Sequence, residues 1–106
     1  MKKWNDKECN MVEWVITYIS EMSVDERYRD GIKQLREKPF SQFSHYTEYQ
    51  KEALAAAITY FEDFYTYSVR GYPKGNKSVR DAMQRITYLK SAREKLMCSL
   101  TEKETV

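Results

Sequence analysis

Apolar side chains recur every three or four residues along most of this chain, which is the spacing of one face of an α-helix. Only three glycines and two prolines interrupt the chain, and this disfavours an all-β fold with its many turns. Helices are predicted over residues 6–22, 24–37, 48–70 and 79–100. Because short connectors join antiparallel neighbours, the pattern predicts an all-α fold, a compact antiparallel bundle of about four helices.

Side chains that cap helices stand where these segments begin and end. The predicted N-caps are Asn5 or Asp6, Ser23, Thr47 and Ser78, and two of them, Ser23 and Thr47, begin a capping box. Pro39 stops the second helix, and Gly71 suits the left-handed backbone that closes the third. Residues 39–46 form a connector, in which we expect Phe40 and Phe43 to lie against the core.

The length of 106 residues fits one domain, residues 1–106, that ends in a polar tail over residues 101–106. The predicted apolar stripe of the first helix consists of Trp4, Met11, Val15, Tyr18, Ile19 and Met22. The predicted stripe of the last helix consists of Val79, Ala82, Met83, Ile86, Leu89, Leu96 and Leu100.

The third predicted helix has two apolar sectors when it is drawn as a wheel of about 100° per residue. The first sector is the expected core face and holds Leu54, Ala57, Ile58, Phe61, Phe64 and Tyr65. The second lies roughly a third of a turn away and holds Tyr49, Ala53, Ala56, Tyr60 and Tyr67, with Asp63 at its edge. The remaining face is expected in water and holds Lys51, Glu52, Thr59, Glu62 and Thr66.

The second sector, with its tyrosines and alanines, has two interpretations. In one, this is the central helix of the bundle, other helices touch both sectors, and the tyrosine hydroxyls reach the rim. In the other, the sector is a contact surface for a partner, because tyrosine supplies large, rigid, amphipathic area at low entropic cost. The predicted protein-binding residues are Tyr49, Tyr60, Asp63 and Tyr67. A symmetric dimer would use the same face equally well.

A basic turn separates the third and fourth predicted helices. Its candidate anion-binding residues are Arg70, Tyr72, Lys74, Lys77 and Arg80. Free N–H groups and the dipole at a helix start favour phosphate or carboxylate, and a tyrosine can stack on a base. The stretch 71–78 differs from the phosphate-binding loop of nucleotide hydrolases in its glycine spacing and in following a helix, so a nucleotide hydrolase is rejected. The alternative is a solvated loop without a ligand.

Arg93 is unusual because it falls on the apolar stripe of the last helix. Such an arginine either lies along the surface with its charged head in water, or it pairs with an acid or reaches an anionic ligand. The acids predicted to be in reach are Glu62 and Asp63.

The sequence offers few residues for metal binding or catalysis. His45 is the single histidine, and Cys9 and Cys98 lie near opposite ends of the chain, so no zinc site, catalytic residue or cofactor is predicted. The two cysteines are expected as free thiols of a cytoplasmic protein. A net charge of +2 neither favours nor disfavours nucleic acid, and no apolar run is long enough for a membrane helix.

Small helical bundles of this length and composition are common among bacteriocin immunity proteins and among phage proteins that act against host defences. We therefore predict a cytoplasmic protein-binding module, an inhibitor or immunity-type factor of phage or mobile-element origin that occludes a partner protein and is not an enzyme. One alternative is a protein that binds or sequesters phosphate-bearing ligands, nucleic acid or a nucleotide, through residues 70–80. A second alternative is a structural helical homodimer or assembly factor.

Overall fold

The computed structural model describes residues 4–73 and 75–102, with side chains as far as residue 100. The described residues form α1 (Asp6–Tyr18), α2 (Arg29–Glu37), α3 (Glu48–Ser68) and α4 (Lys77–Glu102), and they contain no β-strand. Three short 3₁₀ helices, η1 (Glu21–Ser23), η2 (Glu26–Tyr28) and η3 (Phe40–His45), lie in the connections. The all-α prediction is confirmed.

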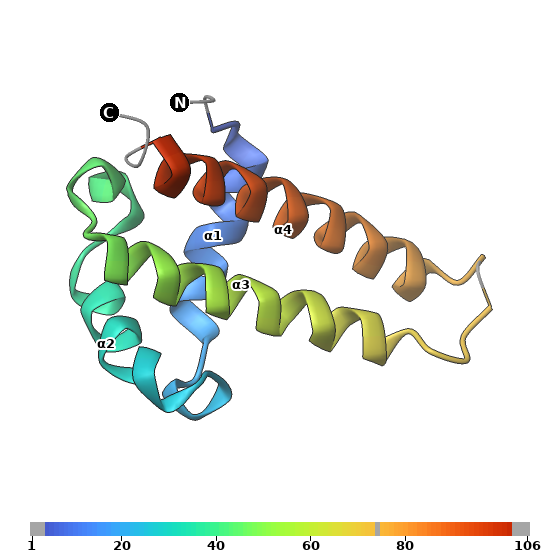
Figure 1. The fold of residues 1–106 in the computed structure, drawn as a ribbon. Helices are drawn as coiled ribbons and strands as arrows, with labels where there is room; N and C mark the ends of the chain where they lie inside the picture. Colours follow the sequence, from blue (N-terminus) through green and yellow to red (C-terminus); the bar gives the residue numbers. More distant parts are fainter. Residues whose placement is uncertain (1–3, 74, 103–106) are drawn as a thin grey trace.

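The two longest helices form an antiparallel hairpin, and the rest of the chain packs around one end of it (Figure 1). α1 runs across both α3 and α4, and α2 lies against the N-terminal part of α3. The other end of the hairpin, where the connecting turn lies, projects beyond α1 and α2. The distal half of α3 is therefore left with fewer neighbours than its first half.

The first helix ends four residues earlier than its apolar stripe predicts. Ile19 takes extended backbone angles (φ −65°, ψ 133°), and Ser20 then caps η1 by accepting the Met22 N–H at 3.2 Å. Met22 lies beyond this end and is 73% exposed, and Tyr18, the last residue of α1, is 64% exposed. Their assignment to the core stripe was wrong.

The start of the second helix also differs from the prediction. The Ser23 capping box does not form, because Ser23 is the last residue of η1, and Asp25 instead caps η2 by accepting the Arg27 N–H at 3.1 Å. α2 proper begins at Arg29, five residues later than the predicted start. Its nine residues make it much shorter than α3.

Two other helix starts follow from their capping side chains. Asn5, with Glu8, and Thr47, with Gln50, form complete capping boxes at α1 and α3. α4 begins two residues before its predicted start, because the cap is Asn76, whose Oδ1 accepts the Ser78 N–H at 2.8 Å. Ser78 is therefore not the cap.

The far ends of the last two helices are also resolved. α3 ends at Ser68, and Gly71 has the expected left-handed backbone (φ 84°). α4 continues to Glu102, so the tail was predicted to begin at least two residues too early, and residues 103–106 lie outside the described part of the chain.

The core lies where α1, α2 and the hairpin meet. Its largest fully buried apolar side chains are Ile19, Ile32, Leu35, Leu54, Ile58, Leu89, Leu96, Val12 and Val15. Trp4 packs edge-on against Phe40 and Phe43 at 5.1 and 5.5 Å between ring centroids, so the 39–46 connector is held against the core as expected. α2 approaches α3 most closely at Gly31, where an added Cβ would lie 2.5 Å from the Ala53 Cβ.

Two charged side chains of α3 that were expected in water are buried against α4. Lys51 Nζ donates to Ser99 Oγ at 2.8 Å, and Glu62 accepts from Arg93 Nε at 2.6 Å and from Arg93 Nη2 at 3.2 Å. Arg93 therefore pairs with Glu62, which is the second of its two predicted arrangements. The exposure predicted for Lys51 and Glu62 was wrong because the wheel treats every charge as outward-facing, whereas α4 lies on that side of α3.

A third buried charge fixes α1 to α4. The Glu8 side chain is fully buried; it accepts the Asn5 N–H at 3.0 Å and also accepts from Ser91 Oγ and Lys95 Nζ. Burial by itself raises the pKa of this carboxyl, but the hydrogen bonds from Asn5, Lys95 and Ser91 outweigh it, so the pKa of Glu8 is lowered from its ordinary value. Glu8 is thus held as a carboxylate.

Candidate functional site

The tyrosine and alanine sector of α3 divides into two halves with different surroundings. In the first half, the Tyr49 hydroxyl accepts the Gly31 N–H at 3.2 Å and donates to the Arg27 carbonyl at 2.5 Å, and Ala53 is completely buried against α2. This half follows the first interpretation, in which a neighbouring helix covers the sector. The Tyr49 hydroxyl is used within the fold, and the candidate surface does not include Tyr49.

In the second half of α3 the same side of the helix is open, because α2 does not extend that far. Tyr60, Phe64 and Tyr67 are 37%, 50% and 64% exposed, and together we call them the aromatic patch. With Asp63 and Ser68 they line a shallow hollow of about 470 Å³. The Tyr60 and Phe64 rings are stacked with centroids 6.4 Å apart (interplanar angle 21°).

Phe64 was predicted as a core residue, and this was wrong. Its side chain is 50% exposed, because it lies on the C-terminal half of α3, whereas α2 packs against the N-terminal part of that helix. The ring is supported from beneath by Tyr65, at 5.5 Å between centroids. The sequence did not identify Phe64 as a candidate binding residue, because an apolar side chain at this helical spacing is expected in the core.

Two charges of opposite sign border the aromatic patch. The Arg70 guanidinium lies over the Tyr67 ring, 4.5 Å from its centroid, and Asp63 lines the hollow. Within the described residues, neither side chain has an ion pair. The patch is therefore an apolar centre with an acid and a base at its margin, which is the usual composition of a contact surface.

The basic turn does not form a concave anion site in the described residues. Arg70, Tyr72, Lys77 and Arg80 are exposed, and Lys74 lies outside the described residues. The hollow of about 360 Å³ beside Tyr72 is lined by Asp81 and Arg85 and not by Lys77 or Arg80. At the start of α4, Asn76 already takes the Ser78 N–H that an anion would use.

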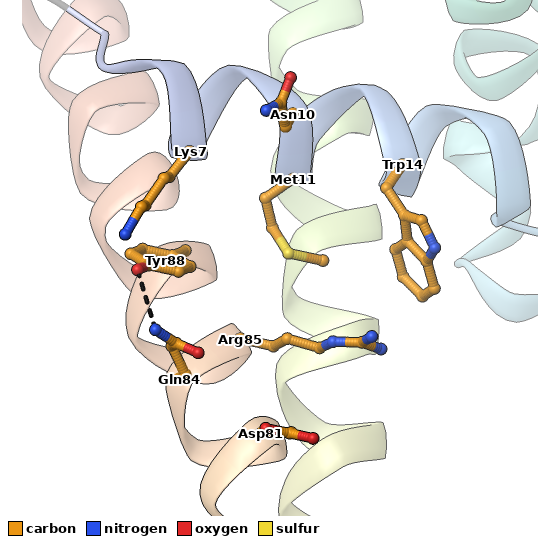
Figure 2. Close-up of a pocket in the computed structure, with 8 residues that line it drawn as sticks. All are labelled: Lys7, Asn10, Met11, Trp14, Asp81, Gln84, Arg85 and Tyr88. Atoms are coloured by element: carbon orange, nitrogen blue, oxygen red, sulfur yellow. Dashed lines mark hydrogen bonds between the residues drawn. The ribbon is translucent and has the colours of Figure 1, made fainter.

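A third hollow, of about 530 Å³, lies between α1 and α4, and we call it the α1–α4 groove (Figure 2). α1 contributes Lys7, Asn10, Met11 and Trp14. α4 contributes Asp81, Gln84, Arg85 and Tyr88. On each helix these residues have the spacing i, i+3, i+4 and i+7, which places them on one face. That shared spacing of polar and aromatic residues is the signal that could have identified the groove.

The cations of the groove are held by aromatic rings. Arg85 Nη1 donates to the Tyr65 hydroxyl at 2.6 Å, and its guanidinium lies 5.4 Å from the Tyr65 ring centroid and 5.9 Å from that of Trp14. Lys7 Nζ lies 5.5 Å from the Tyr88 ring centroid. Hydrogen bonding to Lys7 is the main reason that the pKa of the Tyr88 phenol is lowered.

Metal-binding, thiol and membrane features are limited in the described part of the chain. No three His, Cys, Asp or Glu side chains there are grouped so that they could hold a metal ion. Cys9 and Cys98 are free thiols; burial, together with nearby Asp6 and Glu13, raises the pKa of Cys9. None of the described helices has the length and apolar character needed to cross a bilayer.

The aromatic patch and the α1–α4 groove each combine aromatic side chains with charged groups that have no ion pair within the described residues. No protein-family model matches this chain, and neither a curated protein nor a solved structure matches it significantly.

Proposed function

We propose that this chain is a protein-binding module, and that it binds through the aromatic patch the apolar face of a helix from another protein. The observation that carries the proposal is the exposure of three adjoining rings, Tyr60, Phe64 and Tyr67, on successive turns of α3. Single exposed apolar residues are ordinary, but contiguous apolar surface of this kind marks interaction sites. Aromatic residues are also the side chains that contribute most to binding energy at interfaces.

The continuity of this surface with an internal helix contact supports a helix as the occupant. Along the first half of α3, the same side of the helix is covered by α2, which packs its Ile32 and Leu35 into the core there. A partner helix on the patch would extend that packing toward the tip of the hairpin. Helix-in-groove recognition of this kind is a common mode of protein binding.

The bordering charges would set the register of the partner. Asp63 favours a lysine or arginine on the partner, and Arg70 favours an acid. Rim charges of this kind contribute more to specificity and association rate than to affinity. A partner that presents an apolar stripe between a basic and an acidic residue therefore fits the patch best.

Occlusion is the mode of action that we propose, as for an inhibitor or immunity-type factor. None of the described residues forms a metal site, and a small helical module that covers a partner's surface needs no chemistry of its own. We place it in the cytoplasm, where the free thiols Cys9 and Cys98 would stay reduced.

The test is partner capture from the native host, followed by mapping of the contact. The wild-type chain is compared with a patch variant, Y60A/F64A/Y67A, and with a control variant, Y18A/M22A. The control removes apolar side chains that are at least as exposed as those of the patch but lie at the end of α1 and in η1. Circular dichroism verifies that all three chains are folded. A photo-crosslinking residue at position 64 then identifies the partner segment, which is synthesised as a peptide for titration.

We expect a helical peptide that binds the wild type and the control variant equally. The patch variant should bind at least about 30-fold more weakly, which corresponds to about 2 kcal/mol for a central binding residue. Equal weakening by the Y18A/M22A control would contradict the proposal. So would a wild-type dimer, measured by molecular mass in solution, that the patch variant converts to a monomer, since the occupant would then be a second copy of this chain.

A further inference from the structure

The α1–α4 groove has a chemical character that the proposed function does not use. Met11, which is buried, lies at its base, and the Trp14 and Tyr88 rings stand to either side among polar and charged side chains (Figure 2). Its size, about 530 Å³, is within the range of pockets that hold small organic ligands. The groove therefore offers aromatic surface in a space suited to a small molecule.

Arg85 is positioned in this groove before any ligand arrives. One of its nitrogens is fixed by the Tyr65 hydroxyl, and its plane is held near the rings of Tyr65 and Trp14. Among the described residues, no carboxylate lies within 4.0 Å of it, and its Nε and Nη2 groups have no hydrogen-bond acceptor. An arginine that is oriented in advance loses little conformational entropy when it binds an anion.

Lys7 supplies a second positive charge from the opposite helix. Figure 2 shows its side chain directed from α1 toward Tyr88 on α4, while Arg85 extends beneath Trp14. Within the described residues Lys7 has no carboxylate partner either. The acid of the groove, Asp81, lies one helical turn before Arg85 on α4 and at the end away from Lys7. The two cations thus lie toward opposite ends of the groove, Lys7 beside Tyr88 and the Arg85 guanidinium beneath Trp14, with Met11 between them.

From this arrangement we infer that the α1–α4 groove binds a small aromatic anion along its length, with the carboxylate or phosphate at the Nε and Nη2 groups of Arg85 and the ring system extended across Met11 toward Tyr88 and Lys7. Arginine forms paired hydrogen bonds with both of these anions, and lysine neutralises them as a point charge. For a phosphate-bearing ligand, which the sequence alternative assigned to residues 70–80, this groove of about 530 Å³ on the side of α4 that faces α1 is the more suitable site.

The test is a titration of the full chain by two-dimensional nitrogen–proton NMR, with pairs of probes that differ in charge. Adenosine monophosphate is compared with adenosine, and 1-naphthoate is compared with the neutral 1-naphthamide. Inorganic phosphate alone is the fifth probe. The Trp14 indole signal and the backbone signals of Gln84 and Arg85 report on the groove. The signals of Tyr60 and Tyr67 report on the aromatic patch, which should not respond.

Three variants test the roles of the charges. Lys7→Gln and Arg85→Gln each remove one cation of the groove. Lys90→Gln removes an exposed lysine of α4 that does not line the groove, so it matches the change in net charge. We expect each groove variant to weaken binding of the anionic probe at least tenfold and the Lys90→Gln variant to leave it unchanged.

Saturable shifts of the Trp14 signal by an anionic probe, with its neutral counterpart at least tenfold weaker, support the inference. A response to adenosine monophosphate alone identifies phosphate as the bound group, and a response to 1-naphthoate alone identifies carboxylate. Three results would overturn the inference: no response to either anion at millimolar concentration, equal binding of a neutral counterpart, or equal weakening by Lys90→Gln. A response to inorganic phosphate as strong as that to adenosine monophosphate would also contradict it, because the aromatic surface would then contribute nothing.

Discussion

Among the glutamate-to-glutamine substitutions that we describe, the one at Glu8 should destabilise the protein most. Glu8 is fully buried between α1 and α4 and accepts hydrogen bonds from the Asn5 N–H, the Ser91 hydroxyl and the Lys95 ammonium. Glutamine has nearly the same shape and keeps an oxygen for the Asn5 N–H. The substitution therefore isolates the contribution of the negative charge from that of packing.

The expected loss follows from the contacts that change. The charged hydrogen bond with Lys95 contributes about 1.5–3 kcal/mol. A further loss of about 0.5–1 kcal/mol is expected at Ser91, because the glutamine NH2 replaces Oε2 and the Ser91 hydroxyl must accept from it instead of donating. The Lys95 side chain is 16% exposed, so water can hydrate part of its charge in the variant and the loss stays below the upper limit for a broken buried pair. The free energy of unfolding should fall by about 2–4 kcal/mol.

Urea denaturation at pH 7, followed by circular dichroism, measures this loss. With an m-value of about 1.5 kcal/mol/M, the midpoint should drop by about 1.3–2.7 M. Glu13→Gln, an exposed change on the same helix, is the control and should stay within about 0.5 kcal/mol of the wild type. A loss below about 1 kcal/mol for Glu8→Gln would refute the reasoning, and so would strict additivity of Glu8→Gln with Lys95→Gln.

The same carboxylate gives the protein a defined sensitivity to acid. Because the pKa of Glu8 is lower in the folded state than its ordinary value of 4.5, the folded state binds this proton less readily than the unfolded chain. The stability that Glu8 contributes is thus fully present above about pH 4.5 and is lost as the pH falls through the folded pKa. The difference in stability between the wild type and Glu8→Gln should narrow over that acid range.

Three further changes probe other contacts. Gly31→Ala should cost about 1–3 kcal/mol in chemical denaturation, because its Cβ would lie 2.5 Å from that of Ala53; an unchanged or higher stability would contradict this. Burial raises the pKa of Tyr46 to about 12, so the wild type should lose about 2–3 kcal/mol between pH 10 and 12, and a Tyr46→Phe variant that lost as much would disprove the cause. Glu62→Gln should cost about 1–3 kcal/mol by thermal unfolding, and a double variant with Arg93→Gln should cost less than the sum of the two.

The helices themselves could be predicted from the sequence because each is amphipathic and most begin with a capping side chain. The Thr47 capping box and the left-handed Gly71 are local features that depend on a few neighbouring residues. The end of α1 could not be predicted in this way. No glycine or proline stands near Ile19, whose extended backbone turns the chain toward α2, and the apolar Met22 continues the helical spacing past the real end.

The exposure of single residues depends on contacts between helices, which periodicity does not contain. Lys51 and Glu62 appear to belong to a solvated face until α4 is placed against that face with Ser99 and Arg93 opposite them. Phe64 appears to belong to the core until the covering helix proves too short to reach it. The α1–α4 groove likewise follows from the way α1 crosses the hairpin, which the sequence pattern leaves open.

The aromatic patch is open because α2 and α3 differ in length. At about 1.5 Å per residue, the 21 residues of α3 span about 30 Å, whereas the nine residues of α2 span about 13 Å. α2 can therefore cover less than half of that side of α3. The neighbouring side of the C-terminal half of α3 is covered. There the Trp14 ring of α1 packs against the Phe61 ring, with 4.7 Å between the ring centroids. Three adjoining rings left uncovered beside a covered ring contribute little to the stability of the isolated chain, and burial by another protein is the simplest physical reason for their presence.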